Sequence, residues 1–256
     1  TEIYTLSLHD ALPISQAIVL DVKVGVGAFM QTLEQARQLA QLMTAIAARS
    51  GRRAVALLSD MNQPLGYAVG NALEVKEAIE TLHGGGPADF VEHCLTVASH
   101  LLLLGRRAAD LQTAREMAES ALRGGAAWQM FRKLVAAQGG DVRFVDEPQH
   151  LPAAPIIELV PAPRSGYLQA VDAREIGETA VTLGAGRARK EDPVDPAVGV
   201  VVHGKVGDRL EVGQPLFTLH VNNREALSNA RQRLLAAHHW SEQPCSPLPL
   251  FYEVIA

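Results

Sequence analysis

The chain has 256 residues, of which 48% are hydrophobic and 20% are charged, and its formal net charge is −5. This length and composition allow one large or two smaller globular domains with a real core. The acidic balance and the aromatic content of only 5% argue against a nucleic-acid-binding surface. No apolar run approaches the roughly 18 residues that cross a bilayer. Because Cys94 and Cys245 lie far apart in different kinds of segment, we expect reduced thiols and a cytoplasmic protein.

Residues 1–15, TEIYTLSLHDALPIS, have neither a helical nor an alternating pattern, and Pro13 would interrupt both. They resemble a translated sequencing-adapter tail. We therefore predict that this segment is an artefact, exclude it from the fold argument, and expect the natural protein to begin upstream of Gln16.

The next segment predicts a β-α-β unit. AIVLDVKV at 17–24 is a run rich in β-branched residues, which is typical of a strand buried on both faces in a parallel sheet. Thr32 and Gln35 have the spacing of a capping box, and Gly51 is suited to end the helix that follows them. A second buried strand is predicted at 52–60, so the unit belongs to an α/β core with a right-handed crossover.

A turn-rich loop at 61–71 precedes a mostly helical section. One helix is predicted from the loop to about His83, where a glycine run ends it. Further helices are predicted at 88–104, 111–123 and 126–138, from apolar residues that recur at helical spacing.

Composition changes at 148–163, where PQHLPAAPIIELVPAP contains five prolines and predicts a linker or an extended crossing segment. Short strands with turn signals follow and predict β-hairpins, and a helix is predicted at 223–237. The predicted fold class is α/β: an incomplete α/β domain with a helical segment at 16–147, then the linker, then a small α+β domain at 164–256.

Several stretches carry a family resemblance. DVKVGVGAFM at 21–30 alone is a common strand-to-helix turn. SDMNQPLGYAVGNALEVKEAIETLHGGGPAD at 59–89 is far more specific, and matching stretches follow in order at 130–141 and 166–200. Together they resemble the pyrimidine and thymidine nucleoside phosphorylases, from residue 17 to about residue 252. The resemblance implies a homodimeric pentosyltransferase that converts thymidine and phosphate into thymine and 2-deoxyribose 1-phosphate.

Phosphorolysis needs backbone N–H groups and cations to hold the co-substrate phosphate, and donors to stabilise the departing pyrimidine. The resemblance assigns phosphate binding to a Gly/Ser/Thr-rich region, and base recognition to a His, an Arg, a Ser and a Lys, all before the 17–24 strand. None of those motifs occurs in residues 1–16. We therefore assign no catalytic residue and expect this chain, as given, to be inactive.

The resemblance assigns pyrimidine binding to Phe29 and Met30, whose alternative role is to cover the end of the sheet as core residues. Lys23 protrudes from an otherwise apolar strand end, which is costly unless the side chain is paired or faces a cleft. An ion pair and a substrate-facing role both stay open for it.

The resemblance also makes the carbonyls of Leu65 and Ala68 and the carboxylate of Glu77 ligands of a monovalent cation, potassium, together with two further ligands that lie upstream in the family. Hard cations take oxygen ligands, and a loop that enters a helix is able to turn carbonyls toward one point. The alternative is that Glu77 is a solvated residue on a polar helix face with Glu74 and Glu80.

The histidines show no zinc-ligand spacing, and we expect surface or capping roles for His83, His93, His100 and His203. Ser59 has no nearby histidine that would make it a nucleophile.

Two other function classes compete with the phosphorylase. The hairpins around Lys205 resemble biotinyl/lipoyl carrier domains, although the flanking methionine of such carriers is missing, and a structural role for Lys205 is favoured. A non-catalytic remnant that acts by dimerisation is the other alternative. A phosphoribosyltransferase would require a diphosphate-binding motif that we do not find.

Overall fold

The computed structural model describes residues 15–187 and 189–256. The segment predicted to be foreign therefore lies outside the described residues, except for Ser15. The predicted β-α-β unit is confirmed as β1 (Ala17–Val24), α2 (Leu33–Arg49) and β2 (Arg53–Asp60). The two strands pair in parallel in a continuous register, from Ala17 opposite Arg53 to Val24 opposite Asp60. The capping box of Thr32 and Gln35 is present at the start of α2, and α2 ends just before Gly51 as predicted.

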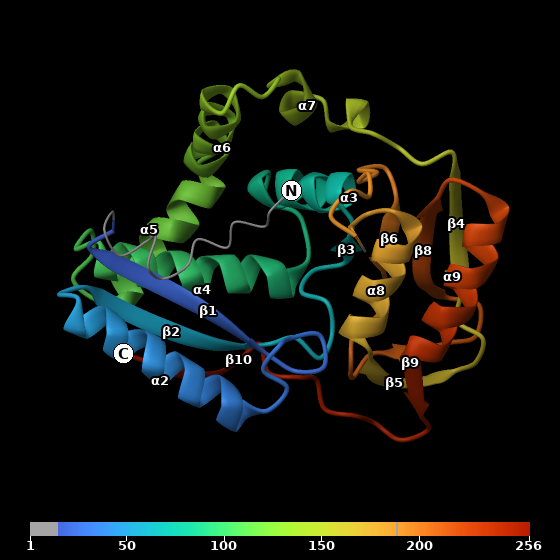
Figure 1. Ribbon diagram of the computed structural model, residues 1–256, viewed down its shortest axis with the longest axis horizontal. Coiled ribbons are helices and arrows are strands. Elements are labelled where there is room, and N and C mark those ends of the chain that lie inside the picture. Colours follow the sequence, from blue (N-terminus) through green and yellow to red (C-terminus); the bar gives the residue numbers. More distant parts are fainter. Residues whose placement is uncertain (1–14, 188) are drawn as a thin grey trace.

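The last strand of the chain completes this first sheet. β10 (Phe251–Ile255) pairs antiparallel with β2, which gives the order β1-β2-β10. Figure 1 shows the end of the chain crossing back from the second half of the molecule to reach this position. Helix α2 packs on one face of the sheet, and α4 contacts the other face through β1 and β2. The core between α2 and the sheet contains Val22, Val24, Ala36, Ala40, Ala56 and Leu58.

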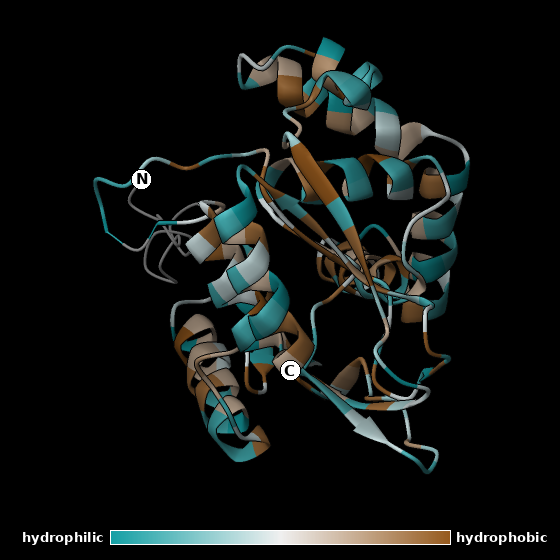
Figure 2. Cartoon of the chain, turned by 90° about the vertical axis from the view of Figure 1, so that its right-hand side faces the viewer, coloured by the Kyte–Doolittle hydropathy of each residue, from teal (hydrophilic) through white to brown (hydrophobic). Residues whose placement is uncertain are grey.

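The predicted helical section is also confirmed. It consists of β3 (Ala68–Val69), α3 (Asn71–Leu82), α4 (Ala88–Leu104), α5 (Leu111–Arg123), α6 (Ala126–Ala137) and α7 (Arg143–Asp146), with a short 3-10 turn at Pro148–His150. The helices carry hydrophilic and hydrophobic residues on different sides (Figure 2). Among the described residues, none of the helices combines the length and the apolarity that a bilayer span requires.

The second half of the chain forms two antiparallel sheets covered by two helices. Their orders are β3-β6-β8-β4 and β7-β5-β9. The elements are β4 (Ile156–Pro161), β5 (Gly166–Val171), α8 (Ala173–Leu183), β6 (Gly199–Val202), β7 (Arg209–Leu210), β8 (Pro215–Val221), α9 (Arg224–Ala237) and β9 (His238–Ser241). Phe217, Leu219 and Leu234 are fully buried in their shared core. The predicted α/β class, the hairpin strands and the helix at 223–237 are thus confirmed, whereas α8 was not predicted.

Two features of the structure concern the region of the predicted linker or extended crossing segment. The linker range 148–163 contains β4, which pairs with β8 from Ile156 to Pro161. Its apolar, β-branched residues outweigh the flanking prolines, and Pro161 stands at the irregular end of the ladder. In addition, β3 pairs with β6, and β10 pairs with β2, so two ladders join the residues before the predicted linker to those after it.

Candidate functional site

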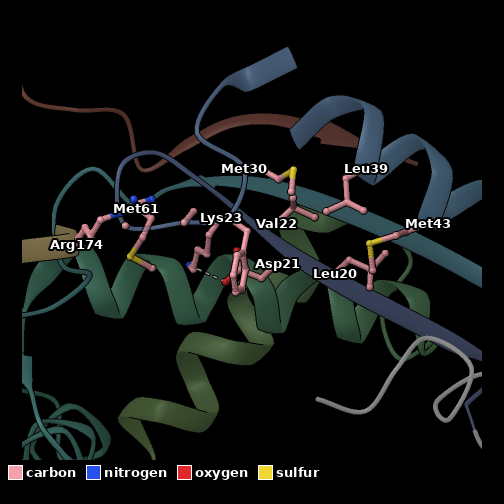
Figure 3. A pocket seen from close by; sticks show the side chains of 12 residues that line it. Leu20, Asp21, Val22, Lys23, Met30, Leu39, Met43, Met61 and Arg174 are labelled. Atoms are coloured by element: carbon pink, nitrogen blue, oxygen red, sulfur yellow. Dashed lines mark ion pairs between the residues drawn. The ribbon is translucent and has the colours of Figure 1, made fainter. Parts of the chain in front are cut away.

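A cavity of about 1080 Å³ is lined by residues of β1, of the loop that follows it and of α2. Successive side chains of a strand point to opposite faces, so Leu20 and Val22 lie on the α2 side, and Asp21 and Lys23 lie on the other side. All four nevertheless line this one cavity, because β1 is the terminal strand of its sheet in the described chain. Figure 3 shows the apolar side chains near α2 and the Lys23–Asp21 ion pair beside them.

Both predicted base-binding residues line this cavity. The Phe29 side chain is 99% exposed, so the alternative of a core role does not hold for it. Met30 packs against the core between α2 and the sheet and forms a bridge with Val24, so it combines a core role with a place at the cavity. Gly27 N–H donates to the Met61 carbonyl at 2.9 Å, which ties the loop to the end of β2. Contact of Phe29 and Met30 with a nucleobase stays a prediction.

The polar side of the cavity is a network centred on the Asp21 carboxylate. Ser59 Oγ lies 2.5 Å from Oδ1, and Lys23 Nζ and His93 Nε2 each lie 2.8 Å from Oδ2. Burial by itself raises the pKa of Asp21, but the hydrogen bonds from His93, Lys23 and Ser59 outweigh it and hold the pKa well below its usual range. Lys23 therefore forms the ion pair that was one of its two predicted roles, and it also lines the cavity.

The prediction of surface or capping histidines is wrong for His93 and His100, which are both buried on α4. Because α4 packs on the sheet, its inward face carries His93 to Asp21, and the imidazole also stacks on Phe251 with ring centroids 4.9 Å apart. His83 does cap its helix, with Nδ1 2.8 Å from the Ile79 carbonyl oxygen, and His203 is exposed.

The network does not make Ser59 a nucleophile. The Asp21 carboxylate lies between Ser59 and His93, whereas nucleophilic activation places the imidazole next to the hydroxyl. Lys23 also donates to Ser59 Oγ at 3.0 Å, but this ammonium is paired with Asp21 and so is not a free base. Polar residues within two largely apolar strands are one sequence signal for this network, whereas no signal points to His93 as the partner.

The three predicted cation ligands line a second cavity, of about 730 Å³. Glu77 Oε2 accepts hydrogen bonds from the backbone N–H groups of Tyr67 at 2.8 Å and Ala68 at 3.1 Å. Burial raises the pKa of Glu77, although these two bonds and the nearby Lys205 oppose the shift. The alternative of a solvated helix face does not hold, because Glu74 and Glu80 are exposed and Glu77 is half-buried.

Backbone geometry places the Ala68 carbonyl on the side of Glu77. Val202 N–H donates to the Tyr67 carbonyl at 2.9 Å, which turns that carbonyl toward β6. Since backbone groups alternate in direction along a strand, the carbonyl of Ala68 in β3 points away from β6. Its own N–H points the same way and meets Glu77. Two of the predicted oxygen ligands thus share one side of β3, which fits a hard monovalent cation.

Lys205, the residue considered for a carrier attachment, is not free at a hairpin tip. Its side chain is 14% exposed, and Nζ lies 2.9 Å from Asp89 Oδ2 and 2.6 Å from the Pro64 carbonyl oxygen. A carrier lysine must be accessible to a modifying enzyme, so the carrier alternative is not favoured.

Comparison with known families now defines the class of protein. Residues 3–128 match the model of the glycosyl transferase family a/b domain, and residues 167–241 match the pyrimidine nucleoside phosphorylase C-terminal domain. A glycosyl transferase a/b domain is therefore followed by a phosphorylase C-terminal domain.

The chain belongs to the pyrimidine-nucleoside phosphorylase family. It is 48% identical over 242 residues to the pyrimidine-nucleoside phosphorylase of Geobacillus stearothermophilus, which covers 94% of this chain and 56% of that protein. It is 49% identical over 208 residues to the Bacillus subtilis (strain 168) protein, which covers 81% of this chain and 48% of that protein. The chain is 43% identical over 241 residues to the Staphylococcus aureus (strain USA300) protein, and the match covers 94% of this chain and 55% of that protein. The chain thus spans about half the length of the curated relatives it matches.

Proposed function

We propose that this chain supplies the base-side wall and a monovalent-cation site of a pyrimidine-nucleoside phosphorylase. The reaction transfers the pentosyl group of a pyrimidine nucleoside, such as thymidine, to inorganic phosphate, and releases the free base and a pentose 1-phosphate. The observation that carries the proposal is the aromatic ring of Phe29, which stands fully exposed beside Met30 at a large cavity. An exposed ring next to a largely apolar cavity is suited to hold a planar base.

In this reaction the bond between the base and the anomeric carbon breaks, and a bond from a phosphate oxygen to that carbon forms. Positive charge develops on the sugar and negative charge on the leaving base, so the site must bind this distribution better than it binds the substrate. Phe29 and Met30 would orient the base, while the Asp21–Lys23 pair gives the wall of the cavity a polar side. Arg174 Nε donates to the Val26 carbonyl at 2.7 Å and so steadies the loop that presents Phe29.

The proposal assigns no catalytic group to residues 16–256, because the family resemblance assigns phosphate and base recognition to motifs outside them. Potassium at Leu65, Ala68 and Glu77 would act by ordering the 61–71 loop beside the cavity, and phosphate would enter as co-substrate. A homodimer, a cytoplasmic location and a role in nucleoside salvage complete the proposal. The two free thiols, Cys94 and Cys245, support the location.

The test is a chimera. The part of the Geobacillus stearothermophilus relative that this chain does not match is joined to residues 16–256, and the product is assayed with thymidine or uridine. We expect phosphate-dependent release of thymine or uracil from the chimera and none from the present chain. A folded, cooperatively unfolding chimera that releases no base would refute the proposal.

A matched pair of variants in the chimera tests whether Phe29 takes part in binding the base. Phe29→Ala should raise the KM for the nucleoside. Met130→Ala should leave the KM unchanged, because Met130 is an exposed apolar residue on α6 that does not line the cavity. Equal effects of the two substitutions would show that Phe29 has no special place in base binding.

A further inference from the structure

The ammonium of Lys205 joins the second half of the chain to the 61–71 loop. Lys205 lies between β6 and β7, about 140 residues along the chain from that loop. Its Nζ donates to the carbonyl oxygens of Pro64 and Gly66 and forms an ion pair with Asp89 at 2.9 Å. The side chain is largely buried, so these contacts replace the water that an exposed ammonium would bind.

Further contacts bind residues 63–67 of the same loop. Val206 N–H donates to Gln63 Oε1 at 2.8 Å, and Asp89 Oδ2 accepts the Gly66 N–H at 3.2 Å. The Lys205 ammonium also lies 5.4 Å from the centroid of the Tyr67 ring. The loop is therefore held by Asp89 of α4 and by Lys205 of the turn between β6 and β7.

The same stretch also carries the predicted cation ligands. There Glu77 holds the N–H groups of Tyr67 and Ala68. The carbonyls of Pro64 and Gly66 are taken up by Lys205, while the Leu65 carbonyl between them receives no hydrogen bond from any residue in the described part of the chain. The three donors of the ammonium are thus matched by Pro64, Gly66 and Asp89, and the Leu65 carbonyl stays available to another cation.

We propose that Lys205 is a positioning residue for the monovalent-cation site: by binding the Pro64 and Gly66 carbonyls, it leaves those of Leu65 and Ala68 to the ion. This inference rests on the cation site of the proposed function. It makes ion affinity depend on a contact between the two halves of the chain.

Charge alone predicts the opposite effect, which makes the inference testable. A fixed ammonium close to the ion repels it, and its removal would leave Asp89 as an extra negative charge next to the loop. If electrostatics dominated, Lys205→Met would strengthen potassium binding. If positioning dominates, the same substitution weakens it, because the carbonyls lose their fixed directions.

The experiment measures thermal unfolding of the full chain as KCl replaces choline chloride at constant ionic strength. We expect potassium to raise the midpoint of the unchanged chain. The half-saturating concentration should increase roughly 10–100-fold in Lys205→Met, the range typical when the support of a metal ligand is removed. Lys205→Arg, which keeps the charge and several donors, should fall between the two.

Lys133→Met is the matched control, because Lys133 is an exposed lysine with no partner among the described residues. Hydrogen exchange of the Tyr67 and Ala68 amides gives a second readout without potassium, and it should accelerate in Lys205→Met but not in Lys133→Met. If Lys205→Met unfolds outright, Asp89→Asn tests the same contacts, and it should likewise accelerate hydrogen exchange of the Tyr67 and Ala68 amides without potassium.

The outcomes separate the two proposals. The absence of a potassium-specific shift in the unchanged chain would refute the cation site, and with it the role given to Lys205. A normal shift combined with unchanged or tighter binding in Lys205→Met would refute the positioning role alone.

Discussion

Gly66 offers the sharpest test of how the loop is built around Glu77. Its φ is +68°, a left-handed conformation that side chains with a Cβ adopt at a cost. A Cβ atom at this position would lie 2.3 Å from Glu77 Oε1, which is far inside van der Waals contact. Gly66→Ala therefore combines backbone strain with displacement of the carboxylate that the N–H groups of Tyr67 and Ala68 bind.

The two effects have separate magnitudes. The left-handed conformation costs an alanine roughly 1 kcal/mol relative to glycine. Moving the Glu77 carboxylate breaks or lengthens two hydrogen bonds, and each contributes about 1 kcal/mol here, because water reaches this half-buried group and replaces part of the loss. Gly66→Ala should thus lower the free energy of unfolding by about 3 kcal/mol.

Gly51→Ala is the matched control. Gly51 has nearly the same φ, +70°, and nothing lies within 4 Å of the position of its Cβ, so it reports the backbone cost alone. Urea unfolding at pH 7 should give a loss of about 1 kcal/mol for Gly51→Ala. The excess of about 2 kcal/mol for Gly66→Ala should disappear in a Glu77→Ala background. Equal losses at the two glycines would refute the contact with Glu77.

Three further predictions concern single side chains. Asp21→Asn should lower stability near neutral pH by about 2–3 kcal/mol, because it leaves the Lys23 ammonium unpaired. Because the pKa of Asp21 is depressed in the folded state, the ionised carboxylate stabilises the fold above the usual value of 3.8, and this stabilisation is lost as the pH falls through the folded pKa. In acid-unfolding curves, the difference in unfolding free energy between Asp21→Asn and the unchanged chain should therefore narrow below about pH 4. Burial raises the pKa of Glu77, so its contribution to the free energy of unfolding is present at low pH and is lost as the pH rises. Glu77→Gln, which stays neutral, should therefore raise the unfolding midpoint at pH 7 without potassium, and it should abolish the shift that potassium causes. Phe29→Ala should change the free energy of unfolding by less than about 0.5 kcal/mol, because the ring is exposed, and a larger loss would indicate a core role.

The parts of the fold that the sequence predicted are those with local signals. The β1-α2-β2 unit combines two apolar runs with a capping box at Thr32 and a glycine at 51, and all of these act within a few residues. Helices α3 to α6 and α9 likewise follow from helical spacing and from the turns that separate them.

The elements that the sequence did not reveal depend on distant partners. β10 exists because it pairs with β2, which ends about 190 residues earlier in the chain, and nothing near residue 251 indicates that partner. Prolines flank β4, so its composition resembles a linker, yet β8 supplies a complete antiparallel ladder. The start of α8 did carry a recognisable cap, because Asp172 accepts a hydrogen bond from the Glu175 N–H.

The same distinction governs the candidate site. Positions 29, 30, 65, 68 and 77 are assigned through the family resemblance of short stretches, and they line two cavities, because each stretch is one strand end with its following loop or helix. The Asp21 network joins three elements, and the inward turn of His93 follows only from how α4 lies on the sheet. Lys205 illustrates the limit of a local motif: its position in a turn suggests an accessible amine, whereas its environment is set by a loop almost 140 residues away. A group whose partners lie on another element has no local signature, and so the contact that we expect to tune ion binding is the one that no short stretch of sequence describes.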